Sequence, residues 1–240
     1  MIDAKLFINN LLHHFGYQIA KSPFSKRQIK SGHFKWLQKF GIKTIIDIGA
    51  NEGQFIDKIS KILPGVNIYS FEPLKDSFIK LEKKISDKKN ITVFNFALGD
   101  EEKENIINRN EYSPSSSLLE LTDLHKNAFP ITKKVKEERV YIKVLDKIAS
   151  ELELKKKVMI KIDVQGYELN VLRGAENAIK DVDIILIETS FYELYKKQPL
   201  FKEIYNFLSD RGFNYYGSLE QLYDGRDGKI LQADSIFIRS

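Results

Sequence analysis

The chain has 240 residues and no cysteine, and 42% of its residues are hydrophobic. This composition predicts one folding unit with a sizeable core and excludes disulfides and thiolate metal sites. The formal net charge is +5, but 38 basic residues are interleaved with 33 acidic ones, so we expect a solvated surface rather than a nucleic-acid-binding stripe. Residues 1–20 contain no long apolar run and no basic leader, which favours an amphipathic helix over a signal peptide. We therefore expect a cytoplasmic location.

Residues 1–42 are expected to form an N-terminal helical extension, followed by a domain spanning 43–240. Five runs rich in Ile, Val and Phe are typical of strands buried on both faces: 43–48, 66–71, 91–96, 158–162 and 182–187. Apolar residues at helical spacing lie between them, at 54–63, 75–86 and 167–179. The repeated strand, helix, strand units predict an α/β fold with a doubly wound, mostly parallel sheet.

Two segments depart from this alternation. Residues 99–146 form a polar stretch that ends in a strand-like run at 139–145, and a loop of that length is usually functional. We therefore interpret it as an insertion on the substrate side of the domain. After a helix near 202–211, strand-like segments at 213–218 and 235–239 are joined through a Gly-containing turn at 223–228, which predicts an antiparallel C-terminal hairpin.

A tight turn follows the first predicted strand. Gly49 and Gly53 let the backbone turn sharply and approach a ligand, and ligands of parallel sheets bind at the carboxyl ends of the strands. Glu72 ends the next strand 25 positions after Asp47, where a carboxylate can accept both ribose hydroxyls of a nucleoside. The turn lacks the middle glycine of a dinucleotide loop and the Lys-Ser/Thr of a Walker loop. A nucleoside cofactor is therefore predicted, with a plain strand-to-helix turn as the alternative.

Further motifs follow this turn in a characteristic order: Asp47-Ile-Gly49-Ala-Asn51-Glu-Gly53-Gln-Phe55, Phe71-Glu72-Pro73, Ala97-Leu98-Gly99-Asp100, the serines before Leu118, Val144-Leu145-Asp146, Lys161-Ile-Asp163-Val-Gln-Gly166-Tyr-Glu168, Leu172-Arg-Gly174-Ala175 and Ile187-Glu188. Together they resemble the FkbM family of methyltransferases, from about residue 44 to the C-terminus. The resemblance implies a Rossmann-like class I methyltransferase fold, S-adenosyl-L-methionine as cofactor, and O-methylation of a hydroxyl on a sugar, glycan or secondary metabolite.

The resemblance also implies which residues bind the cofactor: Asp47, Gly49, Ala50, Asn51, Gly53, Phe55, Glu72, Pro73, Ala97 and Asp163. Two positions depart from the family pattern. Asn51 stands where many methyltransferases carry another glycine, but Asn tolerates the left-handed conformation better than most residues. Gln165 stands where many members carry Glu, which puts any charge-dependent role of that position in doubt.

Methyl transfer to oxygen requires the protein to hold donor and acceptor close together and to accept or mask the hydroxyl proton. Asp163 is the first catalytic candidate, because it ends the fourth predicted strand and Gly166 leaves room for close approach. Its structural alternative is a helix N-cap that binds amides near Tyr167. Glu168 and Glu188 are further catalytic candidates, with a favourable charge at a helix N-terminus and an ordinary strand-end acid as their alternatives.

These carboxylates could instead bind a hard divalent cation that polarises a substrate oxygen. The sequence does not show that they converge, so metal dependence stays open.

Candidate acceptor-binding residues lie in the insertion and after the fifth strand. Tyr112, Ser115, Ser116 and Ser117 offer hydrogen bonds to a polar acceptor, and each is equally compatible with an ordinary polar loop. His125 has a route to the active site, with an exposed loop histidine as the alternative. Tyr192 could stack against a sugar, although the aromatic spacing at 191–195 also fits core packing in a helix.

A methyltransferase for a small-molecule or glycan hydroxyl is the leading prediction. The fourth strand ends in Asp163-Val-Gln-Gly rather than in the Asn/Asp-Pro-Pro-aromatic signature of many N-methyltransferases, which disfavours nucleic acid as the substrate. A non-catalytic nucleoside-binding module is a further alternative, disfavoured by the presence of Gly49, Glu72 and Asp163. We expect no nucleic-acid partner and no transmembrane segment, and homo-oligomerisation stays open.

Overall fold

The computed structural model describes residues 34–110, 116–129 and 135–240. The chain divides into two units, Met1–Lys35 and Trp36–Ser240, and the strands in the described ranges lie in the second. The amphipathic helix expected in residues 1–20 lies outside the described residues, so it stays a prediction. The described part of the extension contains a 3-10 helix, η1 (Lys35–Phe40), with Leu37 buried. Within the described ranges, no helix is long and apolar enough to cross a membrane.

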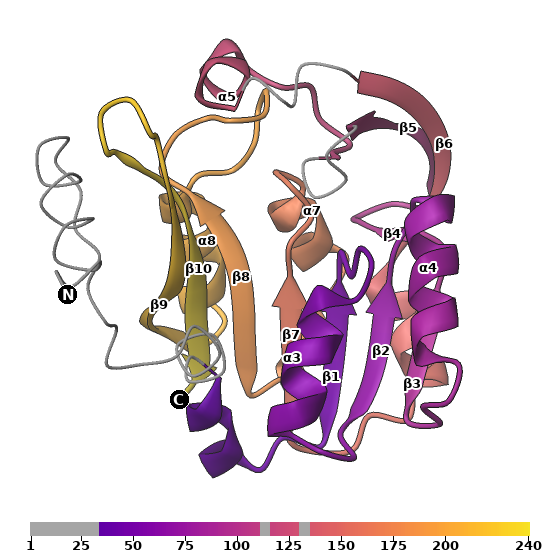
Figure 1. Cartoon of the computed structure of the whole chain (residues 1–240). Helices are drawn as coiled ribbons and strands as arrows, with labels where there is room; N and C mark the ends of the chain where they lie inside the picture. Colours follow the sequence, from indigo (N-terminus) through magenta and orange to yellow (C-terminus); the bar gives the residue numbers. More distant parts are fainter. Residues whose placement is uncertain (1–33, 111–115, 130–134) are drawn as a thin grey trace, which may run out of the picture. The chain divides into compact units, whose positions relative to one another are not determined.

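Seven strands form the central sheet (Figure 1): β1 (Thr44–Ile48), β2 (Asn67–Phe71), β3 (Ile91–Phe94), β7 (Val158–Ile162), β8 (Ile184–Ser190), β9 (Phe213–Tyr223) and β10 (Ile230–Arg239). Their order is β3-β2-β1-β7-β8-β10-β9. Neighbours are parallel, except that β10 runs antiparallel to both β8 and β9. The expected doubly wound sheet with a C-terminal antiparallel hairpin is confirmed. The order reverses at β1, and ligands of such sheets bind beside this point.

Helices cover the sheet because their apolar residues recur along one side. In α3 (Gln54–Ile62) the buried residues are Phe55, Ile56, Ile59 and Ile62, and this helix lies in front of β1 in Figure 1. α4 (Lys75–Ile85) follows β2 and buries Leu81 and Ile85. α7 (Glu168–Arg173) and α8 (Phe201–Ser209) contribute buried residues to the main core.

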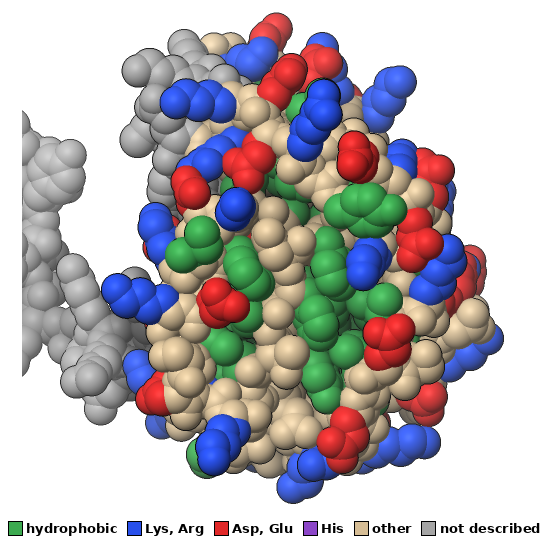
Figure 2. All heavy atoms as spheres, turned by 90° about the vertical axis from the view of Figure 1, so that its right-hand side faces the viewer, with side chains coloured by type: hydrophobic (Ala, Val, Ile, Leu, Met, Phe, Trp, Pro, Cys, Tyr) green, Lys and Arg blue, Asp and Glu red, His purple; other side chains and the backbone are tan. Residues whose placement is uncertain are grey.

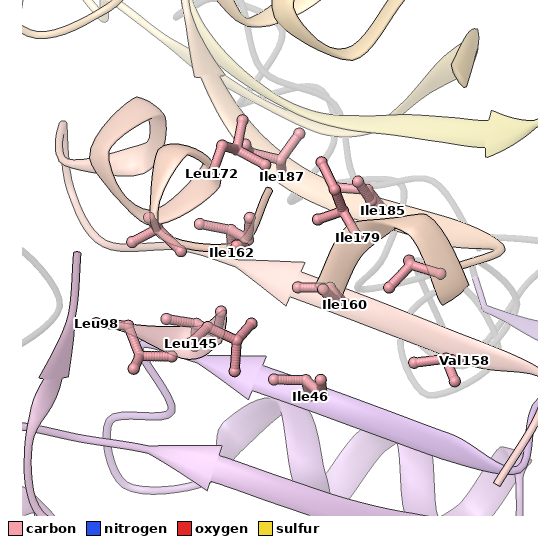
Figure 3. Close-up of a cluster of buried hydrophobic side chains, with 14 of the residues drawn as sticks. Ile46, Leu98, Leu145, Val158, Ile160, Ile162, Leu172, Ile179, Ile185 and Ile187 are labelled. Atoms are coloured by element: carbon pink, nitrogen blue, oxygen red, sulfur yellow. The ribbon is translucent and has the colours of Figure 1, made fainter. Parts of the chain in front are cut away.

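Aliphatic residues from alternate strand positions meet α7 and α8 in this core (Figure 3). Ile46 and Ile48 of β1 are at most 1% exposed. Full burial of one such side chain contributes about 1.5–3 kcal/mol, so the core determines which face of each strand points toward these helices. Because side chains alternate along a strand, Asp47 and Lys161, which are paired in register, point to the opposite face.

The segment 99–146 is not the long loop that the sequence suggested. A second sheet with the order β4-β6-β5 occupies much of it, formed by β4 (Ala97–Leu98), β5 (Lys103–Asn110) and β6 (Val135–Lys143). A short helix, α5 (Asp123–Ala128), lies between β5 and β6 in sequence. β5 was missed because most of its residues are exposed or half-buried, so it lacks the apolar run by which a buried strand is recognised.

The helix expected over 167–179 is in fact two shorter elements. α7 ends at Arg173, and the 3-10 helix η5 (Ala178–Asp181) follows after a break. Gly174 lies at the break, where a Cβ would be 1.9 Å from the Gly99 carbonyl oxygen. The carboxylate of Asp146 accepts hydrogen bonds from the Asn177 and Ala178 amides at the start of η5. Several residues of the family-like motifs therefore have structural roles.

Candidate active site

The carboxyl ends of β1, β2 and β7 are tied together by backbone hydrogen bonds. The Gly49 and Ala50 amides donate to the Phe71 carbonyl at 3.0 and 3.1 Å, and the Asp163 amide donates to the Ile48 carbonyl at 3.0 Å. Gly49 has φ +81°, and a Cβ placed on it would lie 1.9 Å from the Asp163 carbonyl oxygen. Since no larger residue fits, the turn after β1 packs directly against the residue that ends β7.

Two further residues of this turn have a left-handed backbone. Asn51 has φ 47°, which confirms that an asparagine can take the place of a glycine here. Gly53 has φ +80° and precedes α3, and a Cβ at this position would meet Leu81 Cδ1 at 2.7 Å. The N-terminus of α3 has no side-chain cap and lies directly after the turn, where its amides favour a polar or anionic group.

Glu72 is 5% exposed and holds the turn from the end of β2. Its Oε2 accepts the Asn51 amide at 2.8 Å, and its Oε1 accepts the Leu74 amide at 2.9 Å. Burial raises the pKa of Glu72 to about 7, although these two amides act to lower it. A carboxylate has about four lone-pair positions, so two remain for the ribose hydroxyls that the sequence predicted.

The other predicted cofactor residues lie after β2, in α3 and in β4. The Asn95 side chain donates to the carbonyls of Glu72 and Pro73, both at 2.9 Å, and so fixes the segment after β2. Ala97 is buried beside Ile142 of β6. Phe55 is 8% exposed, and Lys161 Nζ lies 5.8 Å from its ring centre.

Lys161 links the turn to the candidate catalytic carboxylate, a role that the sequence analysis missed. Its ammonium donates to the Gly49 carbonyl at 3.1 Å and lies 3.3 Å from Asp163 Oδ2 and 3.5 Å from Asp47 Oδ1. Burial opposes its charge, but Asp163 and Asp47 outweigh that effect and hold the pKa of Lys161 above its usual value. The signal was available, because a lysine inside the apolar run of β7 needs a partner.

Asp47 is fully buried beneath the turn. In the described part of the chain neither of its carboxylate oxygens has a hydrogen-bond partner, and Lys161 supplies the nearby positive charge. Burial raises the pKa of Asp47, and Lys161 partly reverses this. The side chain thus supports the turn from below, and its contact with the cofactor stays a prediction.

Asp163 follows β7 and has a side chain that is 37% exposed. Its Oδ1 accepts a hydrogen bond from Gln165 Nε2 at 2.8 Å, and its Oδ2 faces Lys161. Asp163 does not cap α7, whose N-cap residue is Tyr167 and has no side-chain cap. Glu168 Oε1 accepts the Val164 amide at 3.3 Å and the Gly166 amide at 3.0 Å, so Glu168 closes the loop after β7 and Asp163 stays accessible.

The sequence treated Glu168 and Glu188 as equivalent second candidates, but their positions differ. Glu168 is 3% exposed, and burial raises its pKa to about 7. Glu188 lies inside β8, which extends to Ser190, so it is not the strand-end acid that was expected. Its Oε2 accepts side-chain amides, from Gln165 at 2.9 Å and Gln232 at 2.8 Å, rather than backbone amides.

Asp163 and Glu188 converge on one side chain, Gln165, which donates to both. Burial raises the pKa of Glu188 well above its usual value, and the charges of Asp163, Glu168 and Asp234 raise it further. Within residues 34–110, 116–129 and 135–240, no group of three His, Cys, Asp or Glu side chains is arranged to hold a metal ion. The expectation of a cation therefore gains no support from the described geometry.

The predicted acceptor residues differ in position and in hydrogen bonding. Tyr112 and Ser115 lie outside the described residues. Ser116 Oγ accepts the Asn110 amide at 2.9 Å and holds the end of β5, whereas Ser117 Oγ donates to the Gln165 carbonyl at 2.5 Å and so reaches the site. Tyr192 is 41% exposed after β8.

His125 is a buried residue of α5 rather than an exposed loop histidine. It is 4% exposed, and its ring centre lies 5.2 Å from Tyr195 and 5.3 Å from Phe129. Burial lowers its pKa to about 4, so it is neutral near pH 7. Its packing supports Tyr195, whose hydroxyl donates to Gln165 Oε1 at 2.6 Å. The segment at 191–195 is not helical, and Tyr195 is fully buried.

A separate apolar hollow lies at the β3 edge of the sheet. Figure 2 shows the face on this side of the molecule, where hydrophobic side chains lie among charged ones. The hollow is lined by Phe94, Phe96, Lys143, Ile148, Glu151 and Leu152, none of which was predicted to bind cofactor or acceptor. Lys143 Nζ lies 4.5 Å from the Phe96 ring centre, so its charge is already engaged there.

Comparisons with known proteins agree with this geometry. A model of the methyltransferase FkbM domain matches residues 47–215. The chain is 30% identical over 149 residues to the hexuronic acid methyltransferase AglP of Haloferax volcanii, which covers 59% of this chain and 54% of that protein. The chain thus spans about half the length of this curated relative.

Solved structures with a similar fold share little sequence with the chain. Precorrin-6y C5,15-methyltransferase from Geobacter metallireducens is 11% identical, covers 93% of this chain and 92% of its own, and has a TM-score of 0.44. A fibrillarin pre-rRNA processing protein from Methanococcus jannaschii is 14% identical, covers 82% of this chain and 66% of its own, and has a TM-score of 0.48.

The parallel sheet, the turn after β1 and the acid after β2 are typical of the class I methyltransferase fold. The chain belongs to the FkbM methyltransferase family, whose domain model covers residues 47–215.

Proposed function

We propose that the protein transfers a methyl group from S-adenosyl-L-methionine to a hydroxyl of a sugar, in a glycan or a small glycoside. The observation that carries this proposal is the position of Asp163, which packs against the cofactor turn through Gly49 while its carboxylate stays 37% exposed. The similarity to AglP supports a sugar acceptor, since that relative is a hexuronic acid methyltransferase.

The chemistry needs few protein groups. A lone pair of the acceptor hydroxyl oxygen forms the new O–C bond, and the electrons of the breaking S–C bond return to sulfur, which leaves S-adenosylhomocysteine. The hydroxyl proton passes to a carboxylate, for which Asp163 is the accessible candidate and Glu188 the neighbouring one. Holding the two reactants in line accounts for most of the acceleration in such a displacement, and a base contributes about 10²- to 10⁴-fold.

The remaining residues hold the donor and the site. Glu72 would accept the ribose hydroxyls, while the turn from Gly49 to Gly53 approaches the donor by its backbone. Glu168 is the less accessible carboxylate, because it is 3% exposed and its Oε1 accepts the amides of the loop after β7. Ser117 would position this loop through the Gln165 carbonyl rather than bind acceptor directly.

The test is a donor-dependent acceptor screen. The protein is incubated with S-adenosyl-L-methionine and, separately, with hexuronic acid glycosides, neutral hexosides and bulk RNA. We expect S-adenosylhomocysteine to form together with a sugar product that has gained one methylene in mass and carries an ether-linked methyl group. Methylation of RNA but of none of the sugars, or methylation of a nitrogen atom, would refute the proposal.

A further inference from the structure

Gln165 has a backbone conformation that its side chain disfavours. Its φ is 55°, in the left-handed region where residues other than Gly, Asn and Asp are uncommon. Such a residue persists only where its surroundings hold it. Two contacts do so here: Ser117 Oγ donates to its carbonyl at 2.5 Å, and Tyr195 donates to its side-chain oxygen at 2.6 Å.

The strained backbone aims the side-chain nitrogen at two carboxylates. Gln165 Nε2 lies 2.8 Å from Asp163 Oδ1 and 2.9 Å from Glu188 Oε2, so each of its two protons has an acceptor. Tyr195 fixes the orientation of the amide, because its hydroxyl donates to Oε1 and leaves the nitrogen on the carboxylate side. Tyr195 is itself fully buried against His125.

Two carboxylates this close to one group repel each other unless something positive lies between them. Proteins usually use a shared proton or a bound cation for this purpose. Here the described groups that face the pair are Glu168, Asp234 and Lys161, with Tyr195 behind Gln165. Lys161 contacts Asp163 from the side of Asp47, and Gln165 is the group that bridges Asp163 and Glu188.

We propose that Gln165 is a positioning residue: its amide clamps Asp163 and Glu188 into one geometry and takes the place of a bound cation. This inference rests on the proposed function only where it assigns the two carboxylates to proton transfer; the clamp itself does not depend on it. It predicts that the site keeps its geometry across neutral pH without a divalent metal ion. A glutamate at this position would bring three carboxylates together, which would require a shared proton or a bound cation to hold them.

The first experiment compares Gln165→Glu with the wild type by thermal unfolding between pH 5 and pH 9. The new carboxyl lies beside Asp163 and Glu188, so its pKa in the folded protein is raised above the unfolded value. The folded state then binds more protons, and stability falls as pH rises from the unfolded pKa to the folded one. We expect the unfolding temperature to drop by about 5 °C at pH 8 and by less at pH 5.

Gln38→Glu is the matched control. The Gln38 side chain donates to the neutral carbonyl of Ile62 at 3.0 Å and is exposed to solvent, so water screens a new charge there. Its difference from the wild type should therefore widen with pH far less than that of Gln165→Glu.

The second experiment adds MnCl₂, a probe for a site with three carboxylates. We expect 1 mM Mn²⁺ to restore at least part of the stability of Gln165→Glu and to leave the wild type unchanged. This concentration exceeds the dissociation constant of about 0.1 mM that is typical of weak oxygen-ligand sites. Stabilisation of the wild type by Mn²⁺ would overturn the proposal, because the wild-type site would then hold a cation. A pH-independent loss in Gln165→Glu would also overturn it.

A third measurement uses the wild type and so does not depend on whether a variant folds. The side-chain amide of Gln165 is observed by ¹H–¹⁵N NMR and assigned by its loss in Gln165→Met. We expect slow exchange with solvent and a signal that moves in both Asp163→Asn and Glu188→Gln. An amide signal like that of the exposed Gln221, unchanged in both variants, would refute the clamp. None of these measurements needs the acceptor, so a failed acceptor screen would count against the proposed function alone.

Discussion

Gly49→Ala should damage both the fold and donor binding, and Gly65→Ala provides its matched control. Both glycines have left-handed φ angles, +81° and +77°. An alanine in that conformation costs about 1–2 kcal/mol of folding free energy at either position. At Gly65 nothing lies within 4 Å of the added Cβ, so this conformational cost is the whole expected effect.

At Gly49 the added Cβ would lie 1.9 Å from the Asp163 carbonyl oxygen, whereas real Cβ contacts are essentially never under 3.0 Å. The end of β7 must therefore move by about 1 Å, the difference of the two distances. This movement strains the hydrogen bond from the Asp163 amide to Ile48 and the one from Lys161 to the Gly49 carbonyl. A misplacement of about 1 Å in an active site can lower the reaction rate about 100-fold.

We expect Gly49→Ala to weaken binding of S-adenosylhomocysteine about 100-fold and to lower the free energy of unfolding by about 3 kcal/mol or more. Gly65→Ala should lose about 1–2 kcal/mol and bind the ligand normally. Calorimetric titration and denaturant unfolding measure the two effects. Equal destabilisation of both variants, with donor affinity intact in Gly49→Ala, would show that the turn does not pack against Asp163 as described.

Other residues of the site lead to four further predictions. Asp163→Asn should keep the fold and most donor affinity but lower kcat by about 10²- to 10⁴-fold, and normal turnover with a lower unfolding temperature would instead make Asp163 structural. Glu72→Ala should weaken donor binding by about 10- to 100-fold in calorimetry, since charge-assisted hydrogen bonds to the ribose are lost. Because the pKa of Glu72 is raised to about 7 and ribose hydroxyls bind its charged form, wild-type donor affinity should rise between pH 6 and pH 8, and the rise should disappear in Glu72→Gln. Lys161→Met leaves buried Asp47 without its counter-charge and should lower the free energy of unfolding by about 3–5 kcal/mol. A further Asp47→Asn change should recover part of that loss, and no recovery would show that the pair contributes nothing.

The sequence alone predicted where the central strands lie along the chain and the position of the cofactor turn. Buried parallel strands appear as continuous apolar runs, so β1, β2 and β7 could be recognised from local residues. Gly49, Asn51 and Gly53 could be recognised because left-handed backbone restricts residue type so strongly. Glu72 followed from its place at the end of a strand.

The second sheet and the end of β8 were visible only in the tertiary structure. β5 is largely exposed, so its residues are not selected for the apolar pattern by which strands are recognised. Glu188 lies inside β8 because the strand continues to Ser190 by pairing with β10. Gln232 of β10, which donates to Glu188, is 44 residues further along the chain than Glu188. Pairing between distant segments leaves no local periodicity to read.

The roles of Gln165 and Lys161 were likewise decided by the fold. Gln165 looked like a modest departure from a family pattern, yet its amide joins Asp163 to Glu188, which is 23 residues further along the chain. Lys161 looked like one polar residue in an apolar strand, yet it joins Asp47 to Asp163 beneath the cofactor turn. Sequence shows which groups can ionise or donate, but only the packing of β1, β7 and β8 brings those groups within hydrogen-bonding distance.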